Sequence, residues 1–378
     1  MKTTLKIKLA PTPKQHKDLL RTTEKFNQAC NFIAQVAFDH KLSSKFKLQK
    51  LVYKDVRKRF DLSAQMAVRA IAKVADAYKR DKNKLCEFKP YGAIIYDERI
   101  CSFKGIEYAS LWTIAGRQRI AMVLGDYQKE QWSKQKGQAD LVLIGNTFYL
   151  MATLDIAEES FINTEEFIGV DLGIIKLLVD SLGNEASAEL IEKIRQKYLR
   201  LRRDLQKNYS KNAKRRLKKI ARKEAEFRKQ INHIISKAVV KRAKDTNSGI
   251  GLEILKYIRS RTTVRRADRA RHSGWAFAQL QAFILYKAKI AGVPVIFVDP
   301  RNSSRECSKC HHIAKANRKS QAEFCCLKCG HSENADHNAA KVIAYRANEV
   351  FRASVNRPIA VHADTTNADS LELQAACL

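Results

Sequence analysis

The stretch Phe167-Ile168-Gly169-Val170-Asp171 decides the fold of this chain. Its apolar residues predict a short buried strand, and that strand ends in a carboxylate. A second strand is expected at Lys176–Asp180, after Gly173. Further along, Ile250-Gly251-Leu252-Glu253 is another short apolar strand that ends in a carboxylate. The pattern predicts an α/β domain with acidic side chains at its strand ends.

A third carboxylate, Asp336, opens a helix expected from about Ala335 to Phe351. Two-metal nucleases need several acidic side chains from different elements to hold two Mg²⁺ ions about 4 Å apart. Taken singly, Asp171, Glu253 and Asp336 are each explained as turn or helix-capping residues, Asp336 most easily. Taken together, two strands around a glycine, a later acidic strand and an acidic helix indicate an RNase H-like order.

Five of the nine cysteines lie in one short segment, which favours a metal site over a disulfide framework. Cys307-x-x-Cys310 and Cys326-x-x-Cys329 are separated by 15 residues, the spacing of a four-cysteine zinc ribbon. Four protein thiolates complete a tetrahedron, so the site would be structural. Cys325 could compete with Cys326, although the regular knuckle before Gly330 favours Cys326. Three histidines could also substitute, but four cysteines suffice: His311, His312 and His331.

The chain is strongly basic, with 71 Lys and Arg against 39 Asp and Glu and a formal charge of +32. Such a charge calls for a polyanionic partner, and nucleic acid is the obvious one. An anionic membrane is the rival, but the sequence has no signal peptide and no run of about 18 apolar residues. We therefore expect a soluble intracellular protein.

The helical stretch 191–245 carries 21 basic and 5 acidic residues. A charge run is often only a solvated helix face, but this imbalance favours contact with nucleic acid. A second basic segment follows Glu253. The candidate nucleic-acid-binding residues are Lys207, Lys211, Lys214, Arg215, Lys218, Arg259, Arg261 and Arg265.

The N-terminal part combines a strand, a helical unit and a strand-rich region. Alternation over Thr4–Leu9 predicts one half-buried strand. Thr12, Pro13 and Gln15 then form the expected start of a helix, with a capping box. Two strands flanking Gly145-Asn146-Thr147 predict a hairpin. The first strand has no partner nearby, so we expect it to join this later sheet, with the helical unit as an insertion.

These motifs together resemble the TnpB family, the transposon-encoded RNA-guided nucleases related to type V CRISPR effectors. They occur in order over residues 167–345. The residues that carry the resemblance are Gly169-Val170-Asp171-Leu172-Gly173-Ile174, Leu252-Glu253-Ile254-Leu255-Lys256, Ile258-Arg259-Ser260-Arg261, Arg271-His272-Ser273-Gly274-Trp275, the ribbon with Asn317-Arg318-Lys319-Ser320-Gln321-Ala322-Glu323-Phe324, and Asn334-Ala335-Asp336-His337-Asn338-Ala339-Ala340.

The resemblance implies a multi-domain α/β protein with a RuvC-like RNase H-fold nuclease and an inserted zinc ribbon. A wedge-type β-barrel would carry an inserted helical recognition unit. The implied domains are a wedge barrel at 1–10 and 83–163, a helical recognition unit at 11–82, a RuvC-like nuclease at 164–306 and 331–355, a zinc ribbon for target nucleic acid at 307–330, and a disordered tail at 356–378.

For function, the resemblance implies an RNA-guided DNA endonuclease of a transposable element in the cytoplasm of a prokaryotic cell, associated with the nucleoid when bound to DNA. Asp171, Glu253 and Asp336 would bind two catalytic Mg²⁺ ions, and Arg305 matches an active-site arginine of related nucleases. A guide RNA from the element's end and a double-stranded DNA target beside a short motif would be the partners. The sequence departs from the family's pattern at two positions, Ile254 after the glutamate and His311 after the first knuckle. Neither departure removes a metal ligand.

Two other functions are compatible with parts of the pattern. One is a nuclease-inactive RNA-guided DNA-binding regulator, against which the intact triad counts. The other is a DNA transposase that uses an RNase H-like triad without RNA. RNA of defined length that co-purifies with the protein would exclude the transposase.

Overall fold

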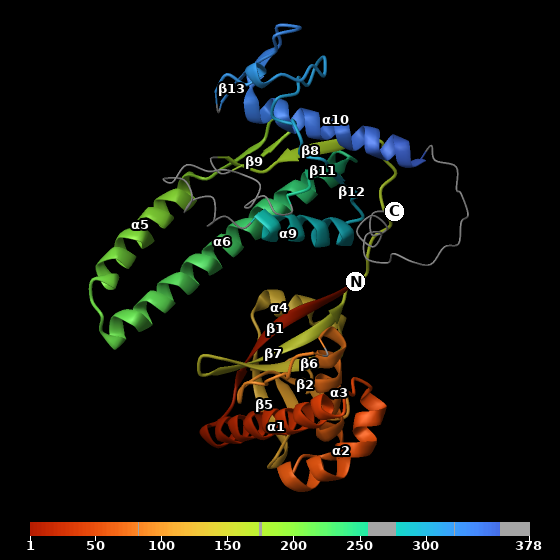
Figure 1. Cartoon of the computed structure of the whole chain (residues 1–378), viewed down its shortest axis with the longest axis vertical. Coiled ribbons are helices and arrows are strands. Elements are labelled where there is room, and N and C mark those ends of the chain that lie inside the picture. Colours follow the sequence, from red (N-terminus) through yellow and green to blue (C-terminus); the bar gives the residue numbers. More distant parts are fainter. Residues whose placement is uncertain (82, 174–175, 256–276, 321, 356–378) are drawn as a thin grey trace. The chain divides into compact units, whose positions relative to one another are not determined.

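The computed structural model of the chain describes residues 1–81, 83–173, 176–255, 277–320 and 322–355. The chain divides into two compact units, Met1–Ala157 and Glu158–Leu378, which are described separately (Figure 1). Across the described residues, no helix is both long enough and apolar enough to cross a membrane.

The first unit contains a seven-stranded antiparallel sheet with the strand order β2-β6-β7-β1-β5-β4-β3. Its strands are β1 (Lys2–Ala10), β2 (Ile94–Tyr96), β3 (Cys101–Lys104), β4 (Tyr108–Thr113), β5 (Gly116–Val123), β6 (Gln135–Ile144) and β7 (Thr147–Asp155). The sheet curls into a nearly closed barrel: the Tyr96 hydroxyl on edge strand β2 donates to the carbonyl of Trp112 on β4, next to the other edge, at 2.8 Å. Closure of this kind protects strand edges.

The N-terminal strand β1 joins a sheet whose other strands begin only at Ile94, as predicted. It pairs antiparallel with β7 from Lys2 opposite Asp155 to Lys8 opposite Tyr149, and with β5 on its other side. The hairpin between β6 and β7 is confirmed too. Its turn is shorter than expected, because Thr147 already belongs to β7 and Gly145 takes the positive φ of 65° that the tight turn needs.

Three helices follow β1 before the chain returns to the sheet: α1 (Pro13–Asp39), α2 (Lys45–Phe60) and α3 (Ala64–Arg80). The capping box is present, since the Thr12 side chain accepts from the Gln15 N–H and the Gln15 side chain accepts from the Thr12 N–H. Side chains such as Leu19 and Phe26 are fully buried in one core with Ile7 of β1. A short helix, α4 (Asp126–Gln131), precedes β6.

The second unit is built on a five-stranded mixed sheet with the order β10-β9-β8-β11-β12. Strands β8, β9 and β10 form an antiparallel meander, whereas β11 and β12 run parallel to β8. The bounds are β8 (Phe167–Asp171), β9 (Lys176–Asp180), β10 (Glu185–Ser187), β11 (Gly249–Glu253) and β12 (Val295–Val298). The predicted strands at 167, 176 and 250 are therefore confirmed.

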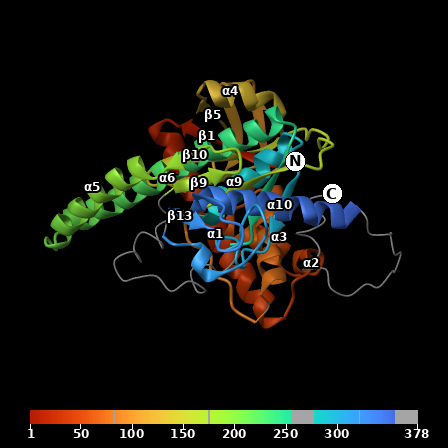
Figure 2. The same ribbon diagram turned by 90° about the horizontal axis from the view of Figure 1, so that it is seen from above.

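Helices cover both faces of this sheet. Helix α10 (Ala335–Val355) lies on one face, and α6 (Lys211–Asp245) and α9 (Phe277–Ile290) lie on the other (Figure 1). Val170 and Leu252 pack in a core cluster with residues of α6 and α9, whereas Phe167 packs with Ile343 of α10. The stretch 191–245 is two helices, α5 (Glu189–Gln206) and α6, which run side by side away from the sheet (Figure 2). The chain reverses between them at Lys207–Ser210.

The cysteine segment has little regular structure. A two-stranded sheet of β13 (Glu323–Cys325) and β14 (Ser332–Asn334) and a single 3-10 turn at Lys315–Asn317 are its only elements among the described residues. The segment leads directly into α10, because β14 ends at Asn334 and the helix begins at Ala335.

Candidate active site and metal sites

Two glycines bring helix α10 close to the sheet. Gly169 of β8 and Gly251 of β11 are register partners, and both face α10. A Cβ on Gly169 would lie 2.0 Å from the carbonyl oxygen of Ala340, and a Cβ on Gly251 would lie 2.9 Å from the Cβ of Ala347. Only glycine permits this approach, since a side chain at either position would collide with the helix.

The same register brings two carboxylates to one edge of the sheet. Val170 pairs with Leu252 in the parallel ladder, so the next residues along each strand, Asp171 and Glu253, are neighbours at the strand ends. Side chains alternate between the faces of a sheet. Asp171 and Glu253 therefore share the face of the glycines, which is the face covered by α10.

Helix α10 supplies the third carboxylate. Asp336 lies in its first turn, but the residue that caps the helix is Asn334, whose side-chain oxygen accepts from the Asp336 N–H at 3.0 Å. Asp336 is therefore not the residue that caps this helix. Its carboxylate is ion-paired with Arg318, with Nη2 and Oδ1 3.3 Å apart.

The pKa values of both strand carboxylates are raised, and nearby carboxylates contribute to the shift of Asp171. Burial, together with the negative charges of Glu253 and Asp336, raises the pKa of Asp171 to about 7, while Arg318 opposes the rise. Burial also raises the pKa of Glu253. Carboxylates that disfavour one another's charge fit a divalent cation, which supplies the missing positive charge. Among the described residues the group of side chains already arranged to hold a metal is the four-cysteine cluster, and the three carboxylates do not form such a group in this structure.

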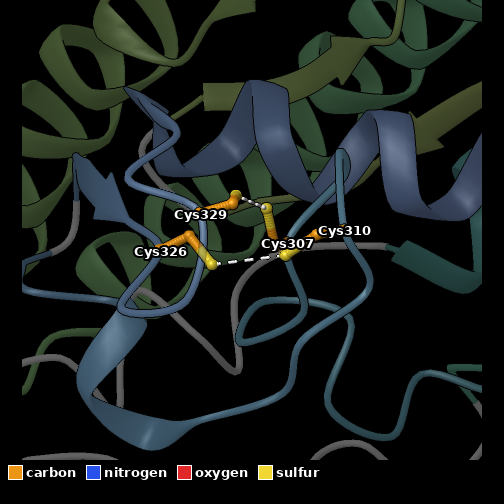
Figure 3. A group of neighbouring side chains, drawn as sticks. All are labelled: Cys307, Cys310, Cys326 and Cys329. Atoms are coloured by element: carbon orange, nitrogen blue, oxygen red, sulfur yellow. Dashed lines mark hydrogen bonds between the residues drawn. The ribbon is translucent and has the colours of Figure 1, made fainter.

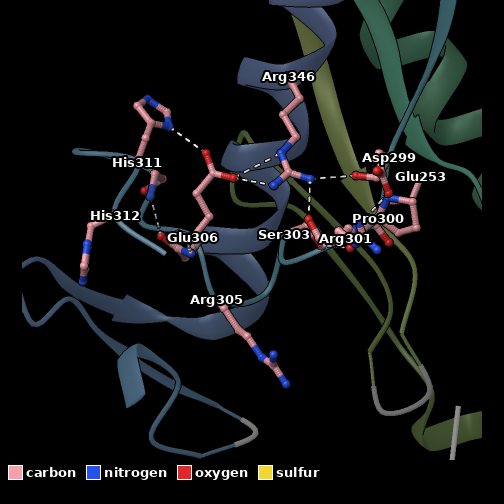
Figure 4. Close-up of polar contacts among 12 residues, drawn as sticks. Glu253, Asp299, Pro300, Arg301, Ser303, Arg305, Glu306, His311, His312 and Arg346 are labelled. Atoms are coloured by element: carbon pink, nitrogen blue, oxygen red, sulfur yellow. Dashed lines mark hydrogen bonds and ion pairs between the residues drawn. The ribbon is translucent and has the colours of Figure 1, made fainter. Parts of the chain in front are cut away.

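The arginine that pairs with Asp336 is Arg318 and not Arg305, the arginine named from the sequence. Arg305, the candidate active-site arginine, has an exposed side chain that points away from Glu253 (Figure 4). Arg318, to which sequence reasoning gave no catalytic role, is half-buried against Asp336. Its position in the motif segment 317–324 was the only available signal, because nothing local marks it among 71 basic residues.

The four cysteines of the two C-x-x-C pairs converge, as predicted (Figure 3). Their Sγ atoms all lie within 4.8 Å of one another, with 3.7 Å from Cys307 to Cys329 and 3.5 Å from Cys310 to Cys326. A Zn–S bond of about 2.3 Å gives tetrahedral edges of about 3.8 Å, so the donor set fits zinc. The spacings are too long for disulfides. Cys325 is not a member of the group.

The two knuckles have matching backbones. In each, the fifth residue donates its N–H to the carbonyl of the first cysteine: His311 to Cys307 at 2.9 Å and Gly330 to Cys326 at 3.0 Å. Both fifth residues have a positive φ, 58° for His311 and 71° for Gly330. The left-handed conformation is uncommon for residues other than glycine. His311 is held there by its Nδ1 contact with Glu306 at 2.8 Å and by stacking on Tyr345.

The predicted nucleic-acid-binding residues fall into two sets. Lys207 lies in the turn between α5 and α6, and Lys211, Lys214, Arg215 and Lys218 lie on the first part of α6; all five are exposed. An ion pair between the buried Glu224 of α6 and Arg202 of α5 holds the two helices together. The second set lies outside the described residues: Arg259, Arg261 and Arg265.

Comparison with known proteins places this arrangement in a family. Residues 277–343, which include the cysteines and the start of α10, match the model of the Cas12f1-like TNB domain. The CRISPR-associated endodeoxyribonuclease Cas12f1 of Sulfoacidibacillus thermotolerans is 40% identical over 121 residues, 32% of this chain and 27% of that protein. Over these residues the chain resembles the TnpB/Cas12f-like family.

Two further relatives extend the TnpB/Cas12f-like match. The putative RNA-guided DNA endonuclease InsQ of Escherichia coli K12 is 28% identical over 50% of this chain and 52% of its own. The TnpB-like protein MJ0751 of Methanocaldococcus jannaschii is 28% identical over 50% of this chain and 73% of its own. A solved Cas12f1–sgRNA–target DNA complex aligns over 91% of the chain and 99% of its own, with 19% identity and a TM-score of 0.42. In sequence, the chain matches about a quarter of the length of the Cas12f1 protein and about half the length of InsQ.

Proposed function

We propose that this protein is an RNA-guided DNA endonuclease of a transposable element, which cleaves DNA next to a short motif by two-metal phosphodiester hydrolysis. The proposal is supported by the nearness of two other carboxylates, Glu253 and Asp336, to Asp171, whose pKa their charges raise. The parallel register of β8 and β11 aligns Asp171 with Glu253, and the packing of α10 on Gly169 and Gly251 adds Asp336.

The fold of each unit supports the proposal. A sheet in the order third, second, first, fourth, fifth, with an antiparallel meander and two parallel strands, is the arrangement expected of an RNase H-like nuclease. We assign the RuvC-like nuclease to 164–306 and 331–355 and the ribbon to 307–330. We assign the wedge-type barrel to 1–10 and 83–163, which extends past the end of the first unit at Ala157, and the recognition unit to 11–82.

The residues of the site have distinct proposed roles. Asp171, Glu253 and Asp336 would hold Mg²⁺, and the ion pair with Arg318 would orient the Asp336 carboxylate. Bound Mg²⁺ ions supply an activated water and charge stabilisation at the leaving oxygen. Cys307, Cys310, Cys326 and Cys329 would hold a structural Zn²⁺ with no position left for a substrate. Arg305 stays a candidate for contact with the scissile strand.

The charge of the chain supports a guide RNA and a double-stranded DNA target as partners. A formal charge of +32 far exceeds what the protein's own acidic residues neutralise. The exposed lysines and arginine at the end of the α5–α6 hairpin offer one phosphate-binding surface. In this proposal, base pairing with the guide reads the sequence and the protein reads backbone shape and the adjacent motif.

Purification with its nucleic acid tests the function. The protein is expressed with the flanking sequence of its element, and the RNA that co-purifies is sequenced. The complex is then given Mg²⁺ and DNA that carries the matching target beside a randomised flanking region. We expect one RNA species of defined length, and cleavage only of matched DNA with a short common flank.

Each other outcome identifies a rival. Bound RNA with matched DNA binding, but no cleavage at any Mg²⁺ concentration, would indicate the nuclease-inactive regulator. Cleavage or strand transfer without bound RNA would indicate the RNA-independent transposase.

A further inference from the structure

Glu253 has a hydrogen-bond partner on a distant loop. Ser303, which is 6% exposed, donates its hydroxyl to Oε1 of Glu253 at 2.5 Å. The serine lies on the segment that leaves β12 and reaches the ribbon at Cys307. A neutral donor on a buried carboxylate fixes which way the carboxylate faces, because it binds one oxygen and leaves the other available.

The loop that carries Ser303 is held by one arginine. Arg346 of α10 donates from Nη1 to the carbonyls of Asp299 at 2.7 Å and Arg301 at 2.9 Å. Its other edge binds Oε2 of Glu306, from Nε at 3.1 Å and from Nη2 at 2.5 Å. Figure 4 shows Arg346 between Glu306 and this loop, with Ser303 beside Glu253. The planar fork of arginine suits such a three-sided contact, which lysine cannot make.

Glu306 is committed to this arrangement and is not a further metal ligand. It is 5% exposed, with Oε2 bound by Arg346 and Oε1 by His311 at 2.8 Å. Its carbonyl accepts from the Asn338 side chain of α10 at 2.7 Å. A buried carboxylate of this kind is expensive to desolvate unless it is paired. Its contacts therefore serve to hold Arg346 and, through it, the loop.

We propose that Ser303 and Arg346 are positioning residues for Glu253: Arg346 sets the loop, and the Ser303 hydroxyl holds the carboxylate in the orientation that accepts a divalent cation. The inference rests on the proposed function, since it takes Glu253 to be a metal ligand. Groups that orient ligands in this way typically change metal affinity about 10- to 100-fold when removed.

Mn²⁺ binding by the full-length protein, measured by electron paramagnetic resonance at pH 8 without RNA, tests the inference directly. Ser303→Ala should weaken binding about tenfold, whereas Ser303→Thr, which keeps the hydroxyl, should bind like the wild type. Arg346→Gln should weaken binding as Ser303→Ala does. Arg352→Gln is the matched control, because Arg352 is an exposed arginine on the same helix whose ion pair, with Glu349, is remote from the loop.

A second measurement is the Mn²⁺ concentration that gives half-maximal cleavage by the RNA complex. We expect it to rise in Ser303→Ala by the same factor as the dissociation constant, with the maximal rate largely recovered at high Mn²⁺. Thermal unfolding of each variant separates a change in orientation from a failure to fold. A Ser303→Ala protein that binds Mn²⁺ like the wild type would overturn the inference, as would an equal decrease of affinity in Ser303→Ala and Ser303→Thr.

Glu253→Gln distinguishes this failure from failure of the proposed function. If Glu253→Gln abolishes Mn²⁺ binding while Ser303→Ala leaves it unchanged, the positioning role alone is wrong. If Glu253→Gln itself binds Mn²⁺ and cleaves DNA normally, the metal site of the proposed function is wrong and the positioning role is wrong with it.

Discussion

At the start of α10, one residue caps the helix and another supplies a carboxylate: Asn334 is the cap and Asp336 carries the carboxylate. Asn334 satisfies the N–H of Asp336, so the Asp336 carboxylate is available to Arg318 and to the strand ends. A carboxylate used as a cap would already be committed to backbone N–H groups. Because Asn334 caps the helix, the Asp336 carboxylate remains available as a candidate metal ligand.

The cysteines give a sharp prediction at the same scale. Cys326→Ser should release zinc and destabilise the ribbon, whereas its neighbour Cys325→Ser should do neither, because Cys325 lies outside the four-sulfur group. Structural zinc binding is coupled to local folding, so removal of one thiolate is costly. Metal analysis of both purified variants checks this. Equal zinc release in the two would mean that the ligand was chosen wrongly.

Lys287 predicts a dependence of stability on alkaline pH. Its ammonium lies between α9 and α6, where it donates to the carbonyl of His233 and the hydroxyl of Ser236, each at 2.6 Å. Burial, with repulsion from Lys237, lowers the pKa of Lys287 from 10.5 to about 8. Between these values the unfolded chain binds more protons, so the free energy of unfolding should rise with pH across this window.

The measurement is the difference in unfolding free energy between the wild type and Lys287→Met. We expect it to be constant below about pH 8 and to move in favour of the wild type up to about pH 10. Lys223→Met, at an exposed lysine, is the control for the removal of one positive charge. A difference that is flat throughout would show that the Lys287 pKa is not lowered.

At the scale of elements, the contact between α10 and the sheet determines whether the site forms. Gly169→Ala would place a methyl group 2.0 Å from the Ala340 carbonyl oxygen and 2.3 Å from the Ala344 nitrogen. Both are backbone atoms that cannot turn aside, so the helix must move. We expect the unfolding free energy to fall by about 3 kcal/mol, near the upper end for overpacked positions, and cleavage to be abolished as Asp336 moves.

Gly125→Ala is the matched control for that substitution. A methyl group there would approach only the side-chain oxygen of Gln128, at 2.9 Å, which can rotate away. Denaturant unfolding followed for both variants should show a large effect at Gly169 and a small one at Gly125. Similar stabilities for the two would contradict the close approach of α10.

The α5–α6 hairpin gives a prediction about nucleic-acid binding. Changing Lys207, Lys211, Lys214, Arg215 and Lys218 to Glu should weaken binding and flatten its salt dependence. Removal of each bound phosphate should reduce the log–log salt slope by about 0.7 to 0.9. The Arg202–Glu224 pair is left intact in this variant, so the two helices should stay together. An unchanged slope would mean that this surface is only solvated.

At the scale of the whole molecule, binding and chemistry should separate. Asp171→Ala, Glu253→Ala and Asp336→Ala each remove one proposed ligand but leave the +32 background almost unaltered. Each should abolish cleavage, since a two-metal site does not tolerate removal of a carboxylate. Guide RNA and target DNA affinities, measured by filter binding at fixed salt, should stay within about threefold of the wild type, because the phosphate-binding charge is retained. Undiminished cleavage by any one variant removes that residue from the triad.

The sequence by itself determined the elements and the local motifs of this protein. The strands at 167, 176 and 250, the capping box at Thr12 and the hairpin around Gly145 all follow from signals within a few residues. The paired C-x-x-C motifs belong with them, because metal-ligand spacing is a local property of the chain. Periodicity, turn chemistry and ligand spacing are readable without knowledge of the fold.

Tertiary structure alone decided how these elements meet. No short-range sequence signal predicts that Gly169 is the register partner of Gly251. None predicts that Asp336 forms an ion pair with Arg318 and not with Arg305, or that Ser303 donates a hydrogen bond to Glu253, 50 residues away in sequence. These contacts depend on the strand register and on where α10 packs against the sheet. Both are set by close packing of the whole unit. Packing is a property of surfaces brought together by folding, so the orientation of the carboxylates could not be read from the chain that carries them.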